Sequence, residues 1–207
     1  MMIAVDGPSA AGKGTLARGI ARALGYHFLD TGSLYRAVGL MMIKHGKALD
    51  DAESAAHFAA TLDVDKIADH ELRNERVAEA ASRISAYPQV RKNLLDFQRA
   101  FARKAPGAVL DGRDIGTVVC PDADLKFFVT AATDVRARRR FDELRGQGVA
   151  TTYEAVLADV MARDERDATR TTAPTAMADD AIMIDTSELT AEEVLKAVLE
   201  VVKDARD

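Results

Sequence analysis

The stretch GPSAAGKGT at residues 7–15 combines three glycines with a lysine, directly after an apolar run at residues 2–5 and directly before an amphipathic segment. A glycine-rich turn between a strand and a helix lets successive backbone N–H groups converge on phosphate oxygens. Gly7, Gly12 and Lys13 match the pattern G-x-x-x-x-G-K, in which the lysine reaches the β- and γ-phosphates. We therefore expect a nucleoside triphosphate to be bound by Gly7, Pro8, Ser9, Ala10, Ala11, Gly12, Lys13, Gly14 and Thr15.

Two oxygen-bearing residues are candidates for holding the metal ion that accompanies such a nucleotide. The strict pattern has Ser or Thr directly after the lysine, whereas here Gly14 precedes Thr15. The apolar residues 108–110 end in Asp111, and a carboxylate in this position can order the water molecules of a metal ion. We expect Thr15 and Asp111 to hold Mg²⁺ through water.

Arginine-rich segments distinguish among the proteins that use such a loop. GTP-binding switches read guanine with Asn-Lys-x-Asp, but the only asparagines, Asn74 and Asn93, are followed by Glu and Leu. Phosphoryl transfer needs positioning and positive charge, and a phosphate-bearing acceptor needs more fixed cations than an alcohol does. Any one charged run alone fits a solvated, ion-paired surface. Four of them occur near strand ends or on helices, which favours a kinase of a phosphate acceptor: DTGSLYR, DGRD, RARRR and RDERDATR.

The order of the expected elements predicts an α/β fold. Short apolar runs alternate with helix-period segments, as in a parallel sheet whose ligand site lies at the carboxyl ends of the strands. The expected strands are 2–5, 27–29, 108–110, 125–129 and 181–184. The expected helices are 14–24 before Gly25, 33–45 before Gly46, 51–61, 74–86, 88–104, 133–145 before Gly146, and two that open with the capping boxes Thr151/Glu154 and Thr190/Glu193. We predict a P-loop three-layer fold with a five-stranded parallel sheet.

Composition favours one intracellular globular domain. The 207 residues are 48% hydrophobic and 29% charged, which suits a domain with a real core. A net charge of -5 argues against an obligate nucleic-acid binder. Cys120 is the only cysteine, which excludes an internal disulfide, and no apolar run approaches the ~20 residues that span a bilayer. We expect a cytoplasmic protein that binds neither nucleic acid nor membrane, with Cys120 as a buried structural thiol.

Five segments, taken in order, resemble the bacterial cytidylate kinases, which are nucleoside monophosphate kinases. They are IAVDGPSAAGKGT, LDTGSLYR, AASRISAYPQVR, VLDGRDIGTVVCPDADLKFFV and RDERDATR, and the likeness runs from Ile3 to Ile184. The resemblance implies an enzyme that uses ATP, with Mg²⁺, to phosphorylate CMP and dCMP.

The resemblance also implies roles for individual residues. Positions that hold the CMP phosphate in the family are matched by Thr31, Tyr35, Arg36, Arg113 and Arg170. Arg163 and Asp167, which share one helical stripe with Arg170, match positions near the sugar. The cytosine-reading positions are matched by Ser82, Arg91 and Asp114, and the arginines of the lid that closes over the phosphoryl group by Arg136, Arg139 and Arg140. Lys13, Arg113 and the three lid arginines are thereby the expected catalytic residues.

One departure from the family concerns the segment after Leu62-Asp63-Val64. The family commonly has a small β-containing insertion there, whereas this chain has the short, charged and helix-like DKIADHELRNERVAEAAS. We expect a monomer with an abbreviated, helical monophosphate-binding insertion at about 36–105, a lid at about 133–149 and a P-loop core at about 1–35, 106–132 and 150–207. Two alternatives remain: a P-loop kinase of another small acceptor such as shikimate or AMP, and a catalytically silent nucleotide-binding regulator.

Overall fold

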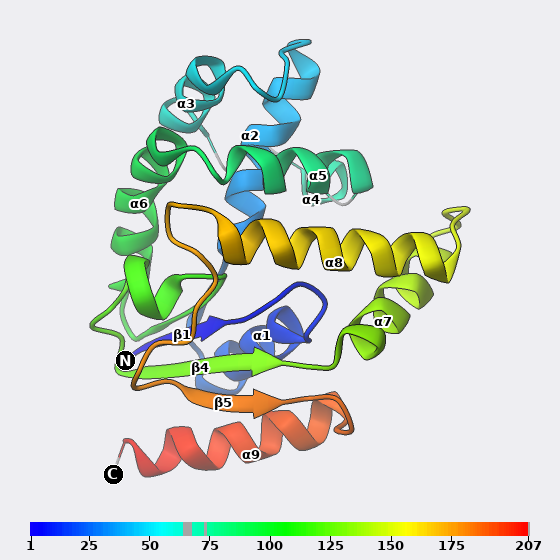
Figure 1. The fold of residues 1–207 in the computed structure, drawn as a ribbon. Helices are drawn as coiled ribbons and strands as arrows, with labels where there is room; N and C mark the ends of the chain where they lie inside the picture. Colours follow the sequence, from blue (N-terminus) through cyan, green and yellow to red (C-terminus); the bar gives the residue numbers. More distant parts are fainter. Residues whose placement is uncertain (64–67, 73, 207) are drawn as a thin grey trace.

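The structure is a computed structural model that describes residues 1–63, 68–72 and 74–206. One parallel sheet is formed by β1 (Met2–Asp6), β2 (His27–Asp30), β3 (Ala108–Asp111), β4 (Leu125–Thr130) and β5 (Ile182–Asp185). The strand order across it is β2-β3-β1-β4-β5. In Figure 1 both chain ends lie on the side of the sheet away from the arrow tips. The predicted five-stranded parallel sheet is confirmed, and the first and last residues of each strand lie within one residue of the expected positions.

Helices make up most of the rest of the described chain. They are α1 (Lys13–Leu24), α2 (Thr31–Lys44), α3 (Ala52–Ala60), α4 (Asp69–Leu72), α5 (Glu75–Ile84), α6 (Pro88–Ala102), α7 (Thr133–Gly146), α8 (Tyr153–Thr169) and α9 (Ala191–Asp204), with a π-helical turn, η2 (Ile115–Val119), after β3.

Helices cover both faces of the sheet because successive side chains of a strand point to opposite faces. Ile3 and Val5 of β1 pack in one cluster with residues of α1 and α9. Ala4, between them, packs in a second cluster with Ala102 of α6 and with η2. The result is the predicted three-layer α/β fold. Cys120 belongs to the second cluster, and burial raises the pKa of its thiol to about 11, as expected of a structural cysteine.

The segment between β2 and β3 forms a separate group of helices, with a core of its own. Leu34, Val38 and Met42 of α2 pack with residues of α3, α5 and α6. Figure 1 shows these helices on one side of α8, with the sheet on the other. Between residues 50 and 105, the described part of the chain contains helices and no strand, as predicted. Residues 65–67 and 73 of the charged segment lie outside the described residues, and the remainder forms α4 and the start of α5.

Helix ends follow the expected signals in part. Gly25, with a φ of 66°, ends α1, and Thr190 and Glu193 form the capping box of α9, as predicted. The prediction of Thr151 as the cap of α8 was wrong: Thr152 accepts the N–H of Ala155, because the helix begins only at Tyr153. α7 ends at Gly146, one residue later than expected, with Gln147 as its C-cap. Gly148, with a φ of 77°, is the glycine in the left-handed conformation after the helix.

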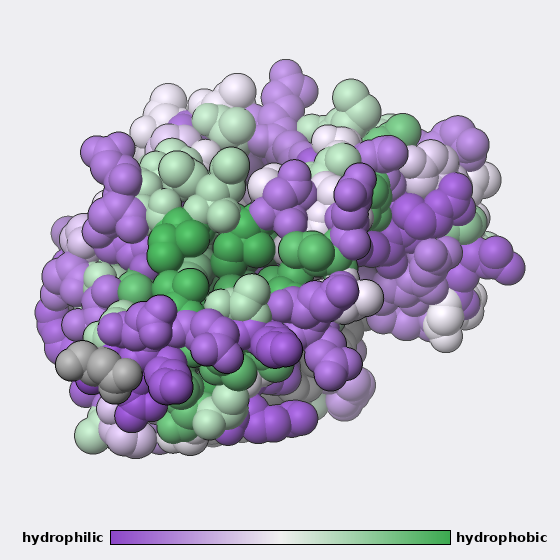
Figure 2. Space-filling model, turned by 90° about the horizontal axis from the view of Figure 1, so that it is seen from below, coloured by the Kyte–Doolittle hydropathy of each residue, from purple (hydrophilic) through white to green (hydrophobic). Residues whose placement is uncertain are grey.

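The surface on the side of α9 mixes hydrophobic and charged residues, as Figure 2 shows. Among the exposed large hydrophobic residues are Ile182 and Met183 of the edge strand β5, which are 42% and 64% exposed. Within the described residues, no helix has the length and hydrophobicity needed to cross a membrane.

Candidate active site

A cavity of about 550 Å³ lies where β1, β2 and β3 end. It is bounded by the loop after β1, by α5, α7 and α8 and by the turn after β3. Of the predicted site residues, the cavity is lined by Ser9, Ala10, Gly12, Lys13, Gly14, Thr15, Thr31, Tyr35, Arg36, Ser82, Arg91, Asp111, Arg113, Asp114, Arg139, Arg140, Arg163, Asp167 and Arg170. Four predicted residues are not part of the lining: Gly7, Pro8, Ala11 and Arg136.

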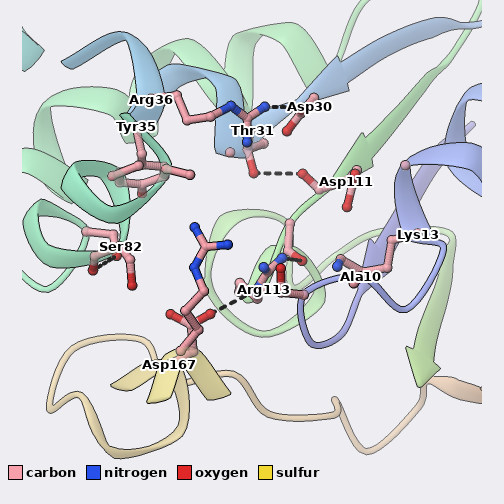
Figure 3. Close-up of a pocket in the computed structure, with 18 of the residues that line it drawn as sticks. Ala10, Lys13, Asp30, Thr31, Tyr35, Arg36, Ser82, Asp111, Arg113 and Asp167 are labelled. Carbon is pink, nitrogen blue, oxygen red and sulfur yellow. Dashed lines mark hydrogen bonds and ion pairs between the residues drawn. The ribbon is translucent and has the colours of Figure 1, made fainter. Parts of the chain in front are cut away.

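The cavity has two ends with different residues. Figure 3 shows Lys13 and Ala10 at one side, Tyr35 and Ser82 at the other, and Arg113 between them. The first end belongs to the loop that precedes α1, and the second to α2 and α5. Residues from distant parts of the chain thus form the two ends of one cavity, with Arg113 between them.

The loop before α1 has the backbone of an anion site. Gly7, with a φ of 139°, passes so close to β4 that a Cβ atom would lie 1.9 Å from the carbonyl oxygen of Val129. Gly12, with a φ of 90°, is the N-cap of α1, which has neither a side-chain cap nor an acidic residue in its first turn. The first N–H groups of α1 are therefore left for an anion, in line with the helix dipole. Gly7 shapes this loop without lining the cavity.

Lys13 begins α1 and is 5% exposed. Its Nζ donates to the carbonyl oxygen of Pro8 at 2.7 Å, which turns the ammonium group back over the loop. The pKa of Lys13 is lowered to about 8, chiefly by burial and to a lesser extent by the positive charge of Arg113. A phosphate placed beside the ammonium group would favour its protonated form. Lys13 is thus positioned to neutralise phosphate charge.

Asp111 ends β3 opposite the first turn of α1. A Cβ atom at Gly14 would lie 3.1 Å from its Oδ2, so the carboxylate faces the residues that follow Lys13. Burial raises the pKa of Asp111, and Lys13 opposes this. Thr15 lines the same cavity. A carboxylate and a hydroxyl are the hard oxygen ligands that Mg²⁺ takes, so these residues fit the ion.

Acidic residues orient the arginines in the middle of the cavity. Arg36 pairs with Asp30 at 2.5 Å, and the Nε of Arg113 donates to Oδ2 of Asp167 at 3.0 Å (Figure 3). The Thr31 hydroxyl donates to the carbonyl oxygen of Asp111 at 2.8 Å, which joins the start of α2 to the end of β3. These contacts hold the guanidinium groups in place before any ligand is bound.

Arg170 lies just beyond α8, as its C-cap. It nevertheless shares the cavity with Arg163 and Asp167 of that helix, as the predicted stripe requires. Its guanidinium is 3.8 Å from Asp167 and 3.7 Å from Asp114, and its buried Nη2 has no hydrogen-bond partner among the described residues. Burial, followed by the charge of Arg91, lowers the pKa of Arg170. An anionic ligand would supply the missing acceptor.

The residues that match the cytosine-reading positions form a buried polar cluster. Arg91 and Asp114 form an ion pair, and Nη1 of Arg91 donates to the carbonyl oxygen of Ser85 at 3.1 Å. The Arg91 guanidinium lies 5.4 Å from the ring centroid of Tyr35. The hydroxyl of Ser82 accepts from Nε of Arg166 at 3.2 Å. The cluster presents a carboxylate and a guanidinium side by side at the end of the cavity away from Lys13.

The three predicted lid arginines take different positions. Arg139 and Arg140 line the cavity, and Arg140 also pairs with Glu143 of α7 and Glu75 of α5. Arg136 is not brought into the cavity, because its guanidinium donates to protein groups: the carbonyl oxygens of Ala131 and Ser9, the hydroxyl of Thr133 and the carboxylate of Asp164. Its contact with a transferred phosphoryl group therefore stays a prediction.

Several acidic residues of the site were missed by the sequence analysis. Asp30 pairs with Arg36 and also caps α2 through the N–H of Ser33, and its place before an expected helix was the available signal. Glu75 and Asp164 carry no such local signal, because the arginines they bind lie far away in the sequence.

Comparison with known proteins shows the family to which the chain belongs. The family model described as cytidylate kinase matches residues 3–204. The cytidylate kinase of Azorhizobium caulinodans is 53% identical over 206 residues, covering 100% of both chains. That of Methylocella silvestris is 51% identical over 207 residues, covering 100% of this chain and 96% of the other. A solved gluconokinase from Sinorhizobium meliloti, 15% identical, shares the fold with a TM-score of 0.50 over 99% of this chain and 93% of the other. The chain belongs to the cytidylate kinase family.

Proposed function

We propose that this chain transfers the γ-phosphoryl group of ATP to CMP and dCMP, forming CDP and dCDP. The observation that carries the proposal is one cavity with a phosphate loop at one end and the Arg91–Asp114 pair at the other. ATP would place its phosphates at Lys13 and the first turn of α1. The acceptor would place its base at the pair and its phosphate near Arg113.

The Arg91–Asp114 pair suits cytosine by its hydrogen-bonding groups. Cytosine has an exocyclic amine that a carboxylate can accept, beside a ring nitrogen and a carbonyl that accept from a guanidinium. In uracil the amine is replaced by a carbonyl and the ring nitrogen becomes a donor. Acceptor would then face acceptor at Asp114, and donor would face donor at Arg91. Unpaired buried groups of this kind disfavour the wrong ligand on the order of 10²-fold or more.

In the reaction, an oxygen of the acceptor phosphate forms a bond to the γ-phosphorus while the bond from that phosphorus to the β–γ bridging oxygen breaks, and ADP leaves. The acceptor phosphate is already ionised at neutral pH, so no protein group has to remove a proton. The chain's contribution is position and charge. We assign the charge around the transferred group to Lys13, Arg113, Arg139 and Arg140, and the acceptor phosphate to Thr31, Tyr35, Arg36, Arg113 and Arg170.

Mg²⁺ would neutralise phosphate charge when bound, and Thr15 and Asp111 are the residues that we expect to hold it. Arg163 and Asp167 would lie near the sugar.

The residues at about 133–149 would act as a lid that excludes water, which limits hydrolysis of ATP. We further propose that the chain works as a cytoplasmic monomer with a P-loop core, a helical insertion at about 36–105 that binds the monophosphate, and this lid.

The test is an acceptor screen with ATP and Mg²⁺ held constant. ADP formation is measured with CMP, dCMP, UMP, AMP, shikimate and no acceptor. We expect CMP and dCMP to raise ADP formation far above the sample without acceptor, and kcat/KM for UMP to be on the order of 10²-fold lower than for CMP. A preference for AMP or shikimate would favour a kinase of another acceptor. An absence of ADP formation with every acceptor would favour a catalytically silent nucleotide-binding regulator.

A further inference from the structure

Asp6 is a buried carboxylate for which the mechanism above has no role. It is the last residue of β1, directly before the phosphate loop, and it is 5% exposed. Its Oδ1 accepts the backbone N–H of Ile115 at 2.8 Å, and its Oδ2 accepts that of Gly116 at 2.7 Å. Burial raises the pKa of Asp6 to about 6 in spite of these two hydrogen bonds. A carboxylate is costly to keep in such a place, so the two contacts call for an explanation.

The two hydrogen bonds hold the far end of a short turn. At its near end, Asp111 belongs to the sheet, where it pairs with Val5 of β1 and Asp30 of β2, and the N–H of Gly112 donates to the carbonyl oxygen of Val5 at 3.0 Å. Arg113 and Asp114 come next and lie beyond the strand pairing. They are the two residues of the turn whose side chains meet the acceptor in the proposed function.

Asp6 anchors the far end of this turn, where η2 begins. Ile115 and Gly116 are the first two residues of η2, and their N–H groups both point to the Asp6 carboxylate. Neither N–H has another helical partner at this end of the element. Without Asp6, two buried donors would lose their acceptors, and the turn would lose its attachment to β1 at the η2 end.

We propose that Asp6 is a positioning residue for the nucleoside monophosphate: it holds the first two amides of η2 and thereby fixes Arg113 and Asp114. The inference rests on the proposed function, which assigns those two residues to the acceptor. Arg113 in turn binds Asp167 at 3.0 Å, and Asp114 binds Arg91. Asp6 therefore links the strand that carries the phosphate loop to the end of the cavity that recognises the acceptor.

Loss of the Asp6 contacts should weaken binding of the acceptor more than binding of ATP. The phosphate loop is shaped by its own glycines and by the start of α1, and Asp111 is held by the strand pairing on both sides. The hydrogen bonds of the Asp6 carboxylate go to Ile115 and Gly116, and it acts on Lys13 through its charge alone. A defect in Asp6 should thus displace Arg113 and Asp114 while the residues around Lys13 stay in place.

The experiment compares Asp6→Asn with wild type. The amide has nearly the shape of the carboxylate, but its NH₂ group would face one of the two N–H donors. We expect KM for CMP to rise by about tenfold or more, with KM for ATP within about threefold of wild type. Amide hydrogen exchange at Ile115 and Gly116, measured without nucleotide, should be faster in the variant. A matched control is Asp124→Asn at the other end of β1, where Asp124 accepts the N–H of Met2 at 2.6 Å and no such changes are expected.

The outcomes separate the two proposals. A wild-type enzyme that does not phosphorylate CMP would overturn the proposed function. Unchanged exchange at Ile115 and Gly116 in Asp6→Asn would overturn the role of Asp6, whatever the acceptor is. A lower melting temperature with unchanged KM for CMP and for ATP would show that Asp6 has only a structural role. An equal rise of the two KM values would show that it serves both ligands. Either result would overturn the proposed role of Asp6. If Asp6→Asn fails to fold, Asp6→Glu keeps the carboxylate but moves the turn by one methylene, and it must raise KM for CMP selectively.

Discussion

Arg136 and Asp164 form a bidentate ion pair that joins the start of α7 to α8. Nη1 of Arg136 lies 3.1 Å from Oδ1 of Asp164, and Nη2 lies 2.6 Å from Oδ2. The same guanidinium donates to the carbonyl oxygen of Ser9 in the phosphate loop at 3.2 Å. Arg136 is 4% exposed, and Asp164 has 28% of its side chain exposed. Three elements of the cavity wall thus meet at one arginine, which positions them from outside the cavity.

Replacing Arg136 should therefore cost stability. Arg136→Ala leaves Asp164 and the carbonyl oxygen of Ser9 without their donor, and removing one partner of a largely buried pair costs on the order of 3 kcal/mol. The free energy of unfolding is measured by urea denaturation. Arg140→Ala is the matched control on the same helix. Its ion pairs are more exposed, so we expect a loss below about 1 kcal/mol together with a lower kcat. Equal losses in both variants would contradict the assignment.

Lys13→Ala should nearly abolish transfer and leave the fold intact. The lysine is assigned to phosphate charge, and we expect kcat/KM to fall on the order of 10³-fold. Stability should stay the same or increase, because the variant removes a buried cation whose lowered pKa reports a cost of burial. Coupled ADP assays and urea denaturation measure the two quantities. Unchanged turnover in a pure, folded variant would exclude the assigned role of the loop.

The pKa of Lys13, about 8, also predicts a pH dependence of ATP binding. The ammonium form attracts phosphate and the neutral amine does not, so affinity is full below the pKa and is lost as pH rises through it. KM for ATP should be constant near pH 7 and rise above about pH 8. Arg stays protonated throughout this range, so any activity left in Lys13→Arg should lack this rise. A flat profile for wild type would contradict the prediction.

Asp114→Ala should narrow the preference for CMP over UMP. We expect kcat/KM for CMP to fall on the order of 10²-fold, because the amine of cytosine loses its acceptor, with a smaller change for UMP. Steady-state kinetics on both acceptors decide the point. Asp114 also lies 3.7 Å from Arg170. If both acceptors slow by the same factor, Asp114 orients the phosphate site and does not read the base.

The parts of the protein that local sequence determined are those in which neighbouring residues specify the backbone. Gly7 and Gly12 take φ values of 139° and 90°, which other residues rarely adopt, so their spacing before Lys13 predicted the phosphate loop. The strands followed from short apolar runs, and each ends within one residue of its expected position. The boundaries between α7 and α8 were predicted less closely. Gly146 and Gly148 offer the same signal for a helix end, and the adjacent Thr151 and Thr152 offer the same signal for a helix start.

Tertiary structure decided which charged groups meet. Arg136, Arg139 and Arg140 lie within five residues of one another, yet only the last two line the cavity. Their spacing gives their relation around a helix and not the direction in which that helix faces. Asp6 binds amides 109 and 110 residues further along the chain. Such contacts arise because parallel strands bring distant segments to one edge of the sheet, where burial removes water and each polar group must find its partner in the protein.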